Sequence, residues 1–513
     1  MELESNKRLL LEEAISIIIN NNKVEIEKES ELIVQESFDF LSKFSLDKVI
    51  YGINTGLGPM AQYKIEDDKL KELQYNLIRS HATGIGEKIP DLYVKASMLI
   101  RLKAIMQGRS GIHPSSVNLL KELINNNVFP LIPEHGGVGA SGDLVQLSHI
   151  ALVLIGEGHV TYKGELKNTK EVFAELGFKP IEIKLREGLS LINGTSVMTG
   201  IGLINVYKAE QLFNWSTIAS VMLNEIVESF DDHFSSELNR VKKHSGQKYV
   251  AEKMRALLAD SKRIARRENY FFTGDNDEEV FTRKVQEYYS LRCVPQILGP
   301  VYDTIKNTEE VIVNEMNSVS DNPIVDVEAE NVFHGGNFHG DYVSLEMDKL
   351  KLAVTRVSML AERQIAFMFN PKVNEILPPF LNLGVLGLNL GMQGTQFTAT
   401  STVAENQALS NSMYVHSIPT NNDNQDIVSM GTNSALITKR VIDNAFQVQA
   451  IEMIALLQAV DYLKIEDKLS SFTKNVYNNL RAIVPVFIED TSKYEELELM
   501  KNYLFNNRID LPK

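Results

Sequence analysis

Three long stretches of this 513-residue chain contain neither glycine nor proline, and they limit the folds that it can adopt. They run over Leu203–Ser245, over Asp341–Asn370 and from Thr432 to beyond Leu463. At about 1.5 Å per residue, each is long enough for a helix of roughly 40–65 Å. In the second stretch Leu350, Val354 and Val357 recur at spacings of three and four, which is typical of a helix with one apolar face. The sequence therefore predicts a mainly α protein with a bundle of very long helices.

The segment between residues 50 and 200 differs, because glycine and proline divide it into short loops such as "YGINTGLGPM" and "IPEHGGVGASG". Strand-like alternation is sparse: Gly158–Gly164 resembles a small hairpin, and Ile181–Leu185 resembles a single strand. We expect three consecutive parts, and loops rather than helices are expected to carry the function. The parts are a loop-rich N-terminal domain over residues 1–200, a central long-helix bundle over residues 201–435, and a C-terminal helical segment over residues 436–513 that packs on the bundle.

The composition argues against several classes of function. The chain carries 52 Lys and Arg against 67 Asp and Glu, so its net charge is −15, and no basic stripe suggests a nucleic-acid surface. Cys293 is the single cysteine, which rules out a disulfide within the chain and fits a reducing compartment. No apolar run is long enough to span a bilayer, and the N-terminus lacks the pattern of a signal peptide. These features predict a cytoplasmic protein without nucleic-acid or membrane partners.

The stretch "GGVGASGDL", residues 136–144, contains the spacing G-x-G-x-x-G of a dinucleotide-binding turn. Such a turn needs a strand before it and a helix after it. Asp143 can cap a following helix, but the preceding segment contains Pro130 and Pro133, and proline removes hydrogen-bond donors from a sheet. Because neither a strand nor a βαβ rhythm is predicted here, we expect no nucleotide cofactor.

Ala140, Ser141 and Gly142 offer a different chemistry. If the loop is compressed, the backbone nitrogen of Gly142 can attack the carbonyl carbon of Ala140, and loss of water closes a five-membered ring. Loss of a second water from Ser141 leaves an exocyclic C=CH₂ group, which is a strong electrophile. Glycine suits the attacking position because it has no Cβ to block the approach. A plain glycine-rich turn before a helix is the structural alternative.

The residues around this triad resemble the signature of a known family. "GGVGASGDLVQLSHIAL" is similar to the signature of the aromatic amino acid ammonia-lyases and related aminomutases, in which Ala-Ser-Gly becomes 4-methylidene-imidazol-5-one (MIO). Seven further blocks resemble the family in family order, between about residues 50 and 435: "YGINTG", "SHATGIG", "NGTS", "YSLRCVPQILG", "NSVSDNP", "GGNFHG" and "NQDIVSMG". The chain as a whole resembles the bacterial tyrosine ammonia-lyases. This resemblance implies the long-helix architecture of the fumarase and aspartase superfamily.

The resemblance also implies roles for residues in these blocks. Tyr51 matches the base that removes the substrate's Cβ proton, and it needs nearby donors because a free phenol has a pKa of about 10. Asn193 and Gln425 match donors to the MIO carbonyl or the substrate. Arg292 matches the bidentate partner of the substrate carboxylate, and Tyr289 of the same block is expected to be catalytic. The remaining matches at the substrate are Ser80, His81, Asn322, Phe338, Glu405 and Asn424.

Other classes of function explain the sequence less well. His334 and His339, like the segment Asp231–His233, lack the spacing of a metal site with a third and fourth ligand, so we expect no metal. An inactive helical scaffold would show losses among the chemical residues, and the sequence shows none. A fumarase or aspartase would carry the loop "SSxMPxKxN", which is absent from the sequence.

The choice of substrate is the least constrained step. The order Ser80-His81 is that of histidine lyases, whereas several tyrosine lyases place histidine one position earlier. After "NGT", however, the segment Ser196–Thr199 resembles tyrosine lyases and tyrosine aminomutases, and some bacterial tyrosine lyases keep the Ser-His pair. Glu405 matches an acidic position of histidine lyases, so histidine remains open. We favour deamination of L-tyrosine to trans-p-coumarate, with histidine ammonia-lyase and tyrosine 2,3-aminomutase activities as alternatives.

The resemblance finally implies an assembly. Family members are homotetramers in which each active site draws on three subunits, so Tyr51 and Asn193 need not come from the same chain. Long helices with more apolar surface than one chain covers are consistent with such an assembly. We therefore expect a homotetramer with shared active sites and a small aromatic amino acid as its substrate.

Overall fold

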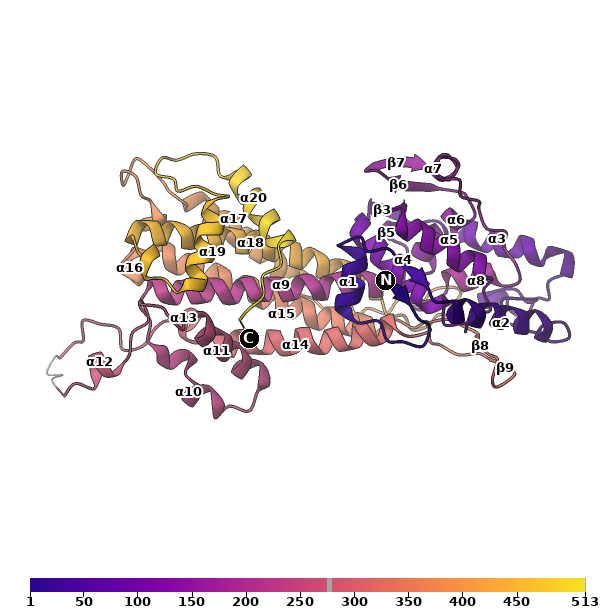
Figure 1. Cartoon of the computed structure of the whole chain (residues 1–513), viewed down its shortest axis with the longest axis horizontal. Coiled ribbons are helices and arrows are strands. Elements are labelled where there is room, and N and C mark those ends of the chain that lie inside the picture. The colour runs from indigo at the N-terminus through magenta and orange to yellow at the C-terminus, as the bar shows by residue number, and fades with distance from the viewer. Residues whose placement is uncertain (275–278, 513) are drawn as a thin grey trace. The chain divides into compact units, whose positions relative to one another are not determined.

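The computed structural model describes residues 1–274 and 279–512 and is dominated by helices (Figure 1). The longest are α9 (Ser196–Ile226), α14 (Val294–Met316), α15 (Asp341–Phe369) and α18 (Gly431–Leu463). The second and third glycine-free stretches become α15 and α18, so the predicted mainly α architecture is confirmed.

The first glycine-free stretch predicts its helix less well. Helix α9 begins at Ser196, runs through Gly200 and Gly202, and ends at Ile226 rather than continuing toward residue 245. Gly200 lies inside the helix because the backbone of α4 (Asp91–Ile105) packs against it, and a Cβ at Gly200 would lie 2.5 Å from the nitrogen of Ser97. Glycine here permits close packing rather than a helix end.

The chain groups into two compact units, each assembled from three segments. The first unit comprises Met1–Asn205, Thr308–Asp348 and Ser412–Thr438, and the second comprises Val206–Asn307, Lys349–Asn411 and Lys439–Lys513. The boundaries fall inside α9, α14, α15 and α18 and in one loop. The three consecutive parts expected from the sequence stay a prediction.

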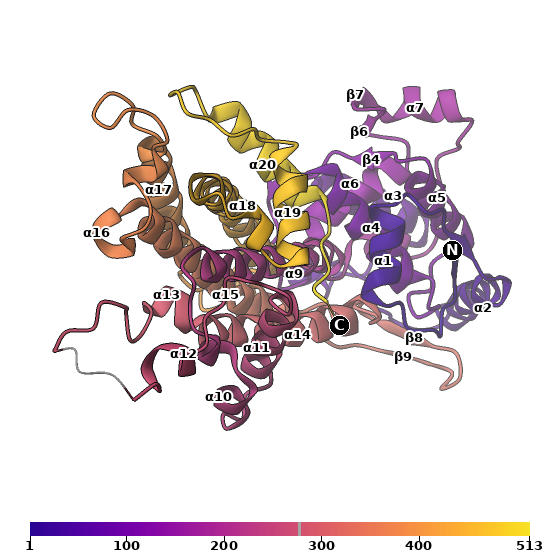
Figure 2. The same cartoon turned by 60° about the vertical axis from the view of Figure 1, so that its left-hand side comes forward.

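The first unit contains eight further helices and all the strands of the described residues (Figures 1 and 2). The helices are α1 (Leu11–Ile18), α2 (Lys28–Phe44), α3 (Leu70–His81), α4, α5 (Pro114–Asn125), α6 (Leu144–Leu154), α7 (Thr169–Leu176) and α8 (Glu187–Ile192). The strands are β1 (Glu2–Leu3), β2 (Glu25–Ile26), β3 (Ile85–Lys88), β4 (Phe129–Pro130), β5 (Pro133–His135), β6 (His159–Tyr162), β7 (Glu165–Asn168), β8 (Ile324–Asp326) and β9 (Asn331–Phe333). Among these strands of the described residues only β1 and β2 pair in parallel, and their sheets have two or three strands each, so none forms a layer of the fold.

The described residues of the second unit form helices and loops, without strands. Its shorter helices are α10 (Ser236–Arg240), α11 (Ser245–Leu257), α12 (Glu268–Phe271), α13 (Tyr289–Arg292), α16 (Pro371–Asn374), α17 (Gln393–Leu409), α19 (Ser471–Arg481) and α20 (Tyr494–Asn506). An ion pair between Arg481 and Asp461 fastens α19 to α18, and the carbonyl of Phe487 accepts a hydrogen bond from the buried Gln458 at 3.0 Å. Figure 2 shows α18, α19 and α20 as neighbours.

Two sequence-based expectations about strands are corrected. Ile181–Leu185 alternates in burial as predicted but forms no strand, because the N–H groups of Ile181, Ile183 and Lys184 donate to Leu154 O, Tyr75 Oη and Glu187 Oε2 instead. Conversely, the proline-containing segment before the glycine-rich turn does form β4 and β5. Both are short and lie at sheet edges, where a missing donor is tolerated. The predicted hairpin is confirmed as β6–β7.

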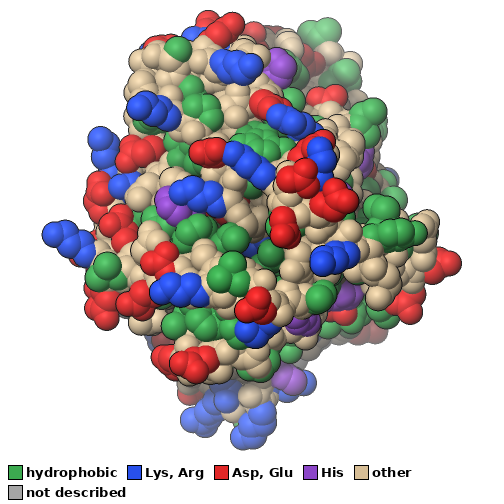
Figure 3. Space-filling view, turned by 90° about the vertical axis from the view of Figure 1, so that its right-hand side faces the viewer, with side chains coloured by type: hydrophobic (Ala, Val, Ile, Leu, Met, Phe, Trp, Pro, Cys, Tyr) green, Lys and Arg blue, Asp and Glu red, His purple; other side chains and the backbone are tan. Residues whose placement is uncertain are grey.

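No helix within residues 1–274 or 279–512 combines the length and apolarity needed to cross a membrane. Figure 3 shows one face of the molecule, on which acidic and basic side chains lie interspersed.

Candidate active site

The Ala140–Ser141–Gly142 turn joins β5 to α6 in the first unit and presses against Gly194. Gly142 has φ 69°, in the left-handed region that glycine adopts readily. A Cβ at this position would lie 2.0 Å from the carbonyl oxygen of Gly194, which in turn accepts a hydrogen bond from Asp143 N at 2.7 Å. Backbone conformation and crowding therefore both require glycine where the proposed cyclisation needs the attacking nitrogen.

The segment before the triad is held by two other parts of the first unit. Met430 N donates to Val138 O at 2.9 Å, and Ser429 Oγ and Gly340 N both donate to Gly139 O, at 2.9 and 3.1 Å. The methyl group of Ala140 is buried in a small apolar cluster that includes Val428 and Met430. The turn is thus fixed on both sides, which is the rigidity that compression of a backbone loop requires.

Two side-chain amides, those of Asn193 and Gln425, donate to Ser141. Asn193 Nδ2 lies 3.2 Å from the carbonyl oxygen of Ser141, and Gln425 Nε2 lies 2.8 Å from its Oγ. In the ring that the triad would form, Ser141 keeps its carbonyl oxygen and loses its hydroxyl, so one donor addresses the oxygen that stays and the other addresses the leaving oxygen. Asn193 Oδ1 is buried and has no partner among the described residues. These residues fit the MIO group.

The loop that carries Asn424 and Gln425 has an unusual backbone. Asn421, Asn422 and Asp423 all adopt positive φ, at 58°, 51° and 60°. Asn and Asp tolerate this region better than other non-glycine residues, which explains the composition "TNNDNQD". Three consecutive left-handed residues are costly, and such strain is concentrated at functional sites. The tight loop aims Gln425 at Ser141.

The first unit contains a pocket of about 880 Å³ that Ser141 helps to line. It brings together most of the residues predicted from the sequence: Tyr51, Ser80, His81, Ser141, Asn193, Asn322, Phe338, Asn424 and Gln425. Ala140 and Gly142 flank Ser141 in the chain. The geometry places a tyrosine, a histidine and the amide donors around one cavity of a size suited to a small molecule.

Tyr51 stands at the pocket on the loop that follows α2. Its phenol oxygen accepts a hydrogen bond from the N–H of Gly58 at 3.0 Å. A backbone donor supports an oxygen that carries negative charge, so the loop supplies one of the donors that a tyrosine base needs. The side chain is half-buried and belongs to the lining of the pocket.

His81 ends α3, and its ring orientation is fixed by a backbone acceptor. Nδ1 lies 2.9 Å from the carbonyl oxygen of Leu77, which can only accept, so Nδ1 carries the proton of the neutral ring. Ser80 Oγ also contacts Nδ1, at 3.1 Å, and donates to Leu77 O at 3.2 Å. In this tautomer Nε2 is a hydrogen-bond acceptor.

Asn322 and Phe338 line another part of the pocket, on the segments that flank β8 and β9. Asn322 Oδ1 accepts a hydrogen bond from Gly335 N at 2.8 Å, so the amide is tied to the "HGGNFHG" segment. Its backbone oxygen accepts from Arg186, which forms a fully buried ion pair with Asp321 at 3.1 Å. The buried ion pair and these hydrogen bonds thus fix the part of the pocket lining that Asn322 provides.

Asp143 caps a different helix from the one expected. Its side chain makes no hydrogen bond to the start of its own helix α6. Instead Oδ2 accepts from Val197 N and Met198 N, at 2.8 and 2.9 Å, and Oδ1 accepts from Thr432 Oγ1. It therefore caps the N-terminus of α9 and ties the starts of α6, α9 and α18 together. Complete burial raises the pKa of Asp143 from its usual 3.8 to about 6, despite these donors.

This shift predicts a pH window for stability. Because the folded-state pKa of Asp143 exceeds the unfolded value, its contribution is fully present below about pH 4 and is lost as the pH rises to about 6. The free energy of unfolding should fall by about 3 kcal/mol over this window for this group. Asp143→Asn keeps an acceptor for the two N–H groups but cannot ionise, so it should lack this component. Urea unfolding of both proteins between pH 4 and 7 measures the difference, and parallel curves would contradict the prediction.

Tyr289, Arg292 and Glu405 belong to the second unit and do not line the first unit's pocket. Glu405 pairs with Arg440 at 3.3 Å and accepts from Asn444 at 3.1 Å. Arg292 donates to Gln286 Oε1 at 2.5 Å and lies over the ring of Tyr289. The roles that the resemblance implied for these three residues stay predictions.

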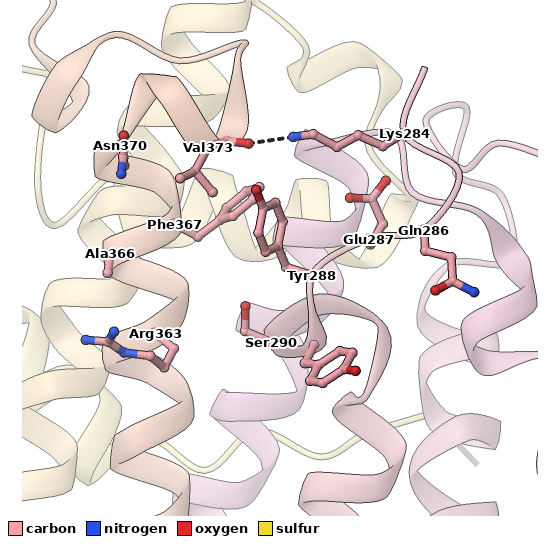
Figure 4. Close-up of a pocket in the computed structure, with 11 residues that line it drawn as sticks. Lys284, Gln286, Glu287, Tyr288, Ser290, Arg363, Ala366, Phe367, Asn370 and Val373 are labelled. Carbon is pink, nitrogen blue, oxygen red and sulfur yellow. Dashed lines mark hydrogen bonds between the residues drawn. The ribbon is translucent and has the colours of Figure 1, made fainter. Parts of the chain in front are cut away.

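Tyr289 borders a second cavity of about 730 Å³, between α15 and the segment before α13 (Figure 4). The rings of Tyr288 and Phe367 meet edge to face in it, and Lys284 reaches across to the carbonyl oxygen of Val373. Among the described residues, no group of three or more His, Cys, Asp or Glu side chains is placed to hold a metal ion.

Sequence reasoning missed several residues that shape the first unit's pocket. Leu73, Asn76 and Leu77 lie on one face of α3, at helical spacing before the predicted Ser80. His334 was considered only as a metal ligand but lines the pocket, and burial together with Arg186 lowers its pKa. Extending the sequence pattern backward from Ser80 along its helix by three, four and seven residues finds the first group.

Comparison with known proteins now identifies the family. Residues 9–482 match the family described as aromatic amino acid lyase. The chain is 40% identical over 461 residues to a tyrosine 2,3-aminomutase of Chondromyces crocatus, covering 89% of this chain and 87% of the relative. It is 38% identical over 457 residues to a histidine ammonia-lyase of Bacillus cytotoxicus, again covering 89% and 87%. The crystal structure of a tyrosine aminomutase from Streptomyces globisporus matches it with a TM-score of 0.95 and 34% identity, over the whole of both chains. This protein is therefore an enzyme of the aromatic amino acid lyase family.

Proposed function

We propose that this enzyme removes ammonia from L-tyrosine to give trans-p-coumarate, with MIO formed from Ala140, Ser141 and Gly142 as its electrophile. The observation that carries the proposal is the placement of Tyr51, His81 and the amide donors Asn193 and Gln425 around Ser141 in one pocket. When formed, MIO supplies an electrophile that no ordinary side chain offers, and it makes the amine a better leaving group.

The residues of the chain divide the remaining work. Tyr51 accepts the proton from the substrate's Cβ, assisted by the N–H of Gly58 on its oxygen. Asn193 donates to the Ser141 carbonyl and stabilises negative charge that develops there. Phe338 and the apolar face of α3 exclude water from the substrate ring. Arg292 is proposed to bind the substrate carboxylate, and this role rests only on the match of the segment "YSLRC" to the family.

His81 supports a substrate whose ring carries a hydrogen-bond donor. With Nδ1 bonded to Leu77 O, Nε2 offers an acceptor at the pocket. The phenol O–H of tyrosine satisfies this acceptor, whereas phenylalanine leaves it unpaired. A site built around such a bond rejects the analogue that lacks it by on the order of 10⁴-fold.

Two alternatives share this chemistry. The imidazole N–H of histidine also satisfies an acceptor, and one relative is named a histidine ammonia-lyase. Another relative is named a tyrosine 2,3-aminomutase, an enzyme that would return the amine to the neighbouring carbon. We further propose a homotetramer, in which Tyr289, Arg292 and Glu405 of other subunits complete the pocket.

Product analysis tests the proposal and separates the alternatives. The purified enzyme is incubated separately with L-tyrosine, L-histidine and L-phenylalanine, and the products are resolved by chromatography. We expect p-coumarate and ammonia from tyrosine, with phenylalanine turned over at least about 10³-fold less efficiently because the His81 acceptor stays unpaired. Urocanate as the main product would establish a histidine lyase, and accumulation of β-tyrosine would establish an aminomutase. Gel filtration of the same sample reports the oligomeric state.

A matched variant checks the assigned role of His81. His81→Leu removes the acceptor and keeps an apolar side chain, so the preference for tyrosine over phenylalanine should fall by about 10²-fold or more. An unchanged preference would show that another group recognises the ring.

A further inference from the structure

Gln74 lies on α3, is fully buried and does not line the pocket. Its amide nitrogen donates to the carbonyl oxygen of Gly52 at 3.0 Å, and its amide oxygen accepts from the N–H of Leu189 at 3.1 Å. If the amide were flipped, its NH₂ group would face the N–H of Leu189 and its oxygen would face the carbonyl oxygen of Gly52. The hydrogen-bond partners therefore determine the orientation of the amide. Few side chains supply one donor and one acceptor in this arrangement.

The backbone around Gln74 leaves no room for adjustment. Gly52 has φ 76°, and a Cβ there would lie 2.3 Å from Leu189 Cδ2. A Cβ at Gly188 would lie 2.6 Å from the backbone oxygen of Gln74 and 2.9 Å from its Oε1. Three segments therefore meet here in close contact, and the amide of Gln74 on α3 is a polar link between the Gly52 loop and helix α8.

Each of these segments carries a residue of the proposed site. Gly52 directly follows Tyr51, helix α3 ends in Ser80 and His81, and helix α8 is followed at once by Asn193. The carbonyl oxygen of Gly52 and the N–H group of Leu189 both bond to the Gln74 amide rather than to each other. The Gln74 amide therefore links the loop that carries Tyr51 to helix α8, which directly precedes Asn193.

We propose that Gln74 is a positioning residue that holds the base Tyr51 in register with the donor Asn193 and with His81. The inference rests on the proposed deamination for its kinetic consequence, whereas the placement itself is a matter of the fold. Displacement of a base by about 1 Å costs on the order of 10²-fold in rate. Loss of the amide should therefore lower kcat more than it raises KM.

Two substitutions separate positioning from simple packing. Gln74→Leu fills the space but removes both hydrogen bonds, so kcat should fall by about 10²-fold at every pH. In Gln74→Glu, the protonated acid reproduces both bonds, because its O–H donates to Gly52 O and its carbonyl accepts from Leu189 N. The ionised form instead sets a negative oxygen against Gly52 O. Burial raises the pKa of such a carboxyl well above about 4.3.

The decisive measurement is kcat of each variant divided by kcat of the unaltered enzyme at the same pH, from pH 6 to 9. For Gln74→Glu this ratio should rise at least about 10-fold as the pH falls, because protonation of the carboxylate restores both hydrogen bonds that the glutamine amide makes. For Gln74→Leu it should stay low and flat. A ratio near one for Gln74→Leu, or a ratio for Gln74→Glu that stays as low as that of Gln74→Leu at every pH, overturns the proposal.

A control variant and a second readout distinguish this failure from failure of the proposed function. Gln458→Leu removes an equally buried amide of the second unit, which donates to Phe487 O and accepts from Arg481. It should lower stability without changing the pH profile. Nitration of Tyr51 by tetranitromethane, followed by peptide mass spectrometry, needs no turnover and should be faster in Gln74→Leu than in Gln458→Leu. Faster nitration in an enzyme that turns over none of the three amino acids would overturn the proposed function and support the positioning role. Equal nitration rates would overturn the positioning role.

Discussion

Ser141→Ala is expected to lower turnover of the amino acid by at least about 10³-fold. The variant keeps the backbone of the turn and its close contact with Gly194. Because alanine has no hydroxyl to lose, the C=CH₂ group cannot form. Intact-protein mass spectrometry should show the unaltered enzyme lighter than its sequence by two water molecules. The variant should retain the water that leaves with Ser141 Oγ.

Ser148→Ala provides the matched control, since Ser148 is buried on α6 and its hydroxyl donates only to Leu144 O. It should keep both the mass deficit and most of the activity. If Ser141→Ala remained active, or if the unaltered enzyme had the full mass of its sequence, the proposed electrophile would be wrong.

Tyr51→Phe should lower kcat by about 10²–10⁴-fold while the mass deficit of the protein stays. The phenol oxygen is the group assigned to the Cβ proton, and its Gly58 donor is left without an acceptor in the variant. Removing this oxygen touches neither Asn193 nor Gln425, so formation of MIO should proceed. Steady-state rates with the preferred amino acid, together with the intact mass, measure both quantities.

Tyr75→Phe is its counterpart, because the oxygen of Tyr75 also accepts a backbone N–H, from Ile183 at 3.3 Å, but does not border the pocket. It should lose a little stability and keep kcat. Equal losses of kcat in the two variants would mean that Tyr51 supports the loop rather than accepting a proton.

Local sequence information was sufficient where local structure decides the outcome. Helix α15 follows from its apolar spacing of three and four together with the absence of glycine and proline over Asp341–Asn370. Recognition of the Ala140–Ser141–Gly142 turn likewise rested on a chemical requirement that three adjacent residues fulfil. The pocket brings residues of several of these blocks together within one chain, Tyr51 and Asn193 among them, and their roles stay predictions.

The remainder depends on contacts that the sequence does not reveal. Asp143 stands where it can cap α6, yet it caps α9, since the start of that helix reaches the carboxylate in the folded chain. Ile181–Leu185 has the alternation of a strand, but helix ends and side chains take its hydrogen bonds. Gln74 is one polar residue among several on α3, and only its two backbone partners distinguish it. Long-range hydrogen bonds set each of these outcomes, and no local pattern encodes them.

The attachments of the glycine-rich turn also bear on the order of events during synthesis. Gly139 is held by Gly340 and Ser429, and Asp143 by Thr432, so the turn gains its last supports only after more than four-fifths of the chain has been made. A nascent chain that ends before these residues lacks the anchors that compress the loop. Under the proposed chemistry, a reactive alkene would thus arise only in folded chains that extend beyond Thr432. Formation of the electrophile would then depend on folding of the first unit, and truncated chains would not carry the reactive group.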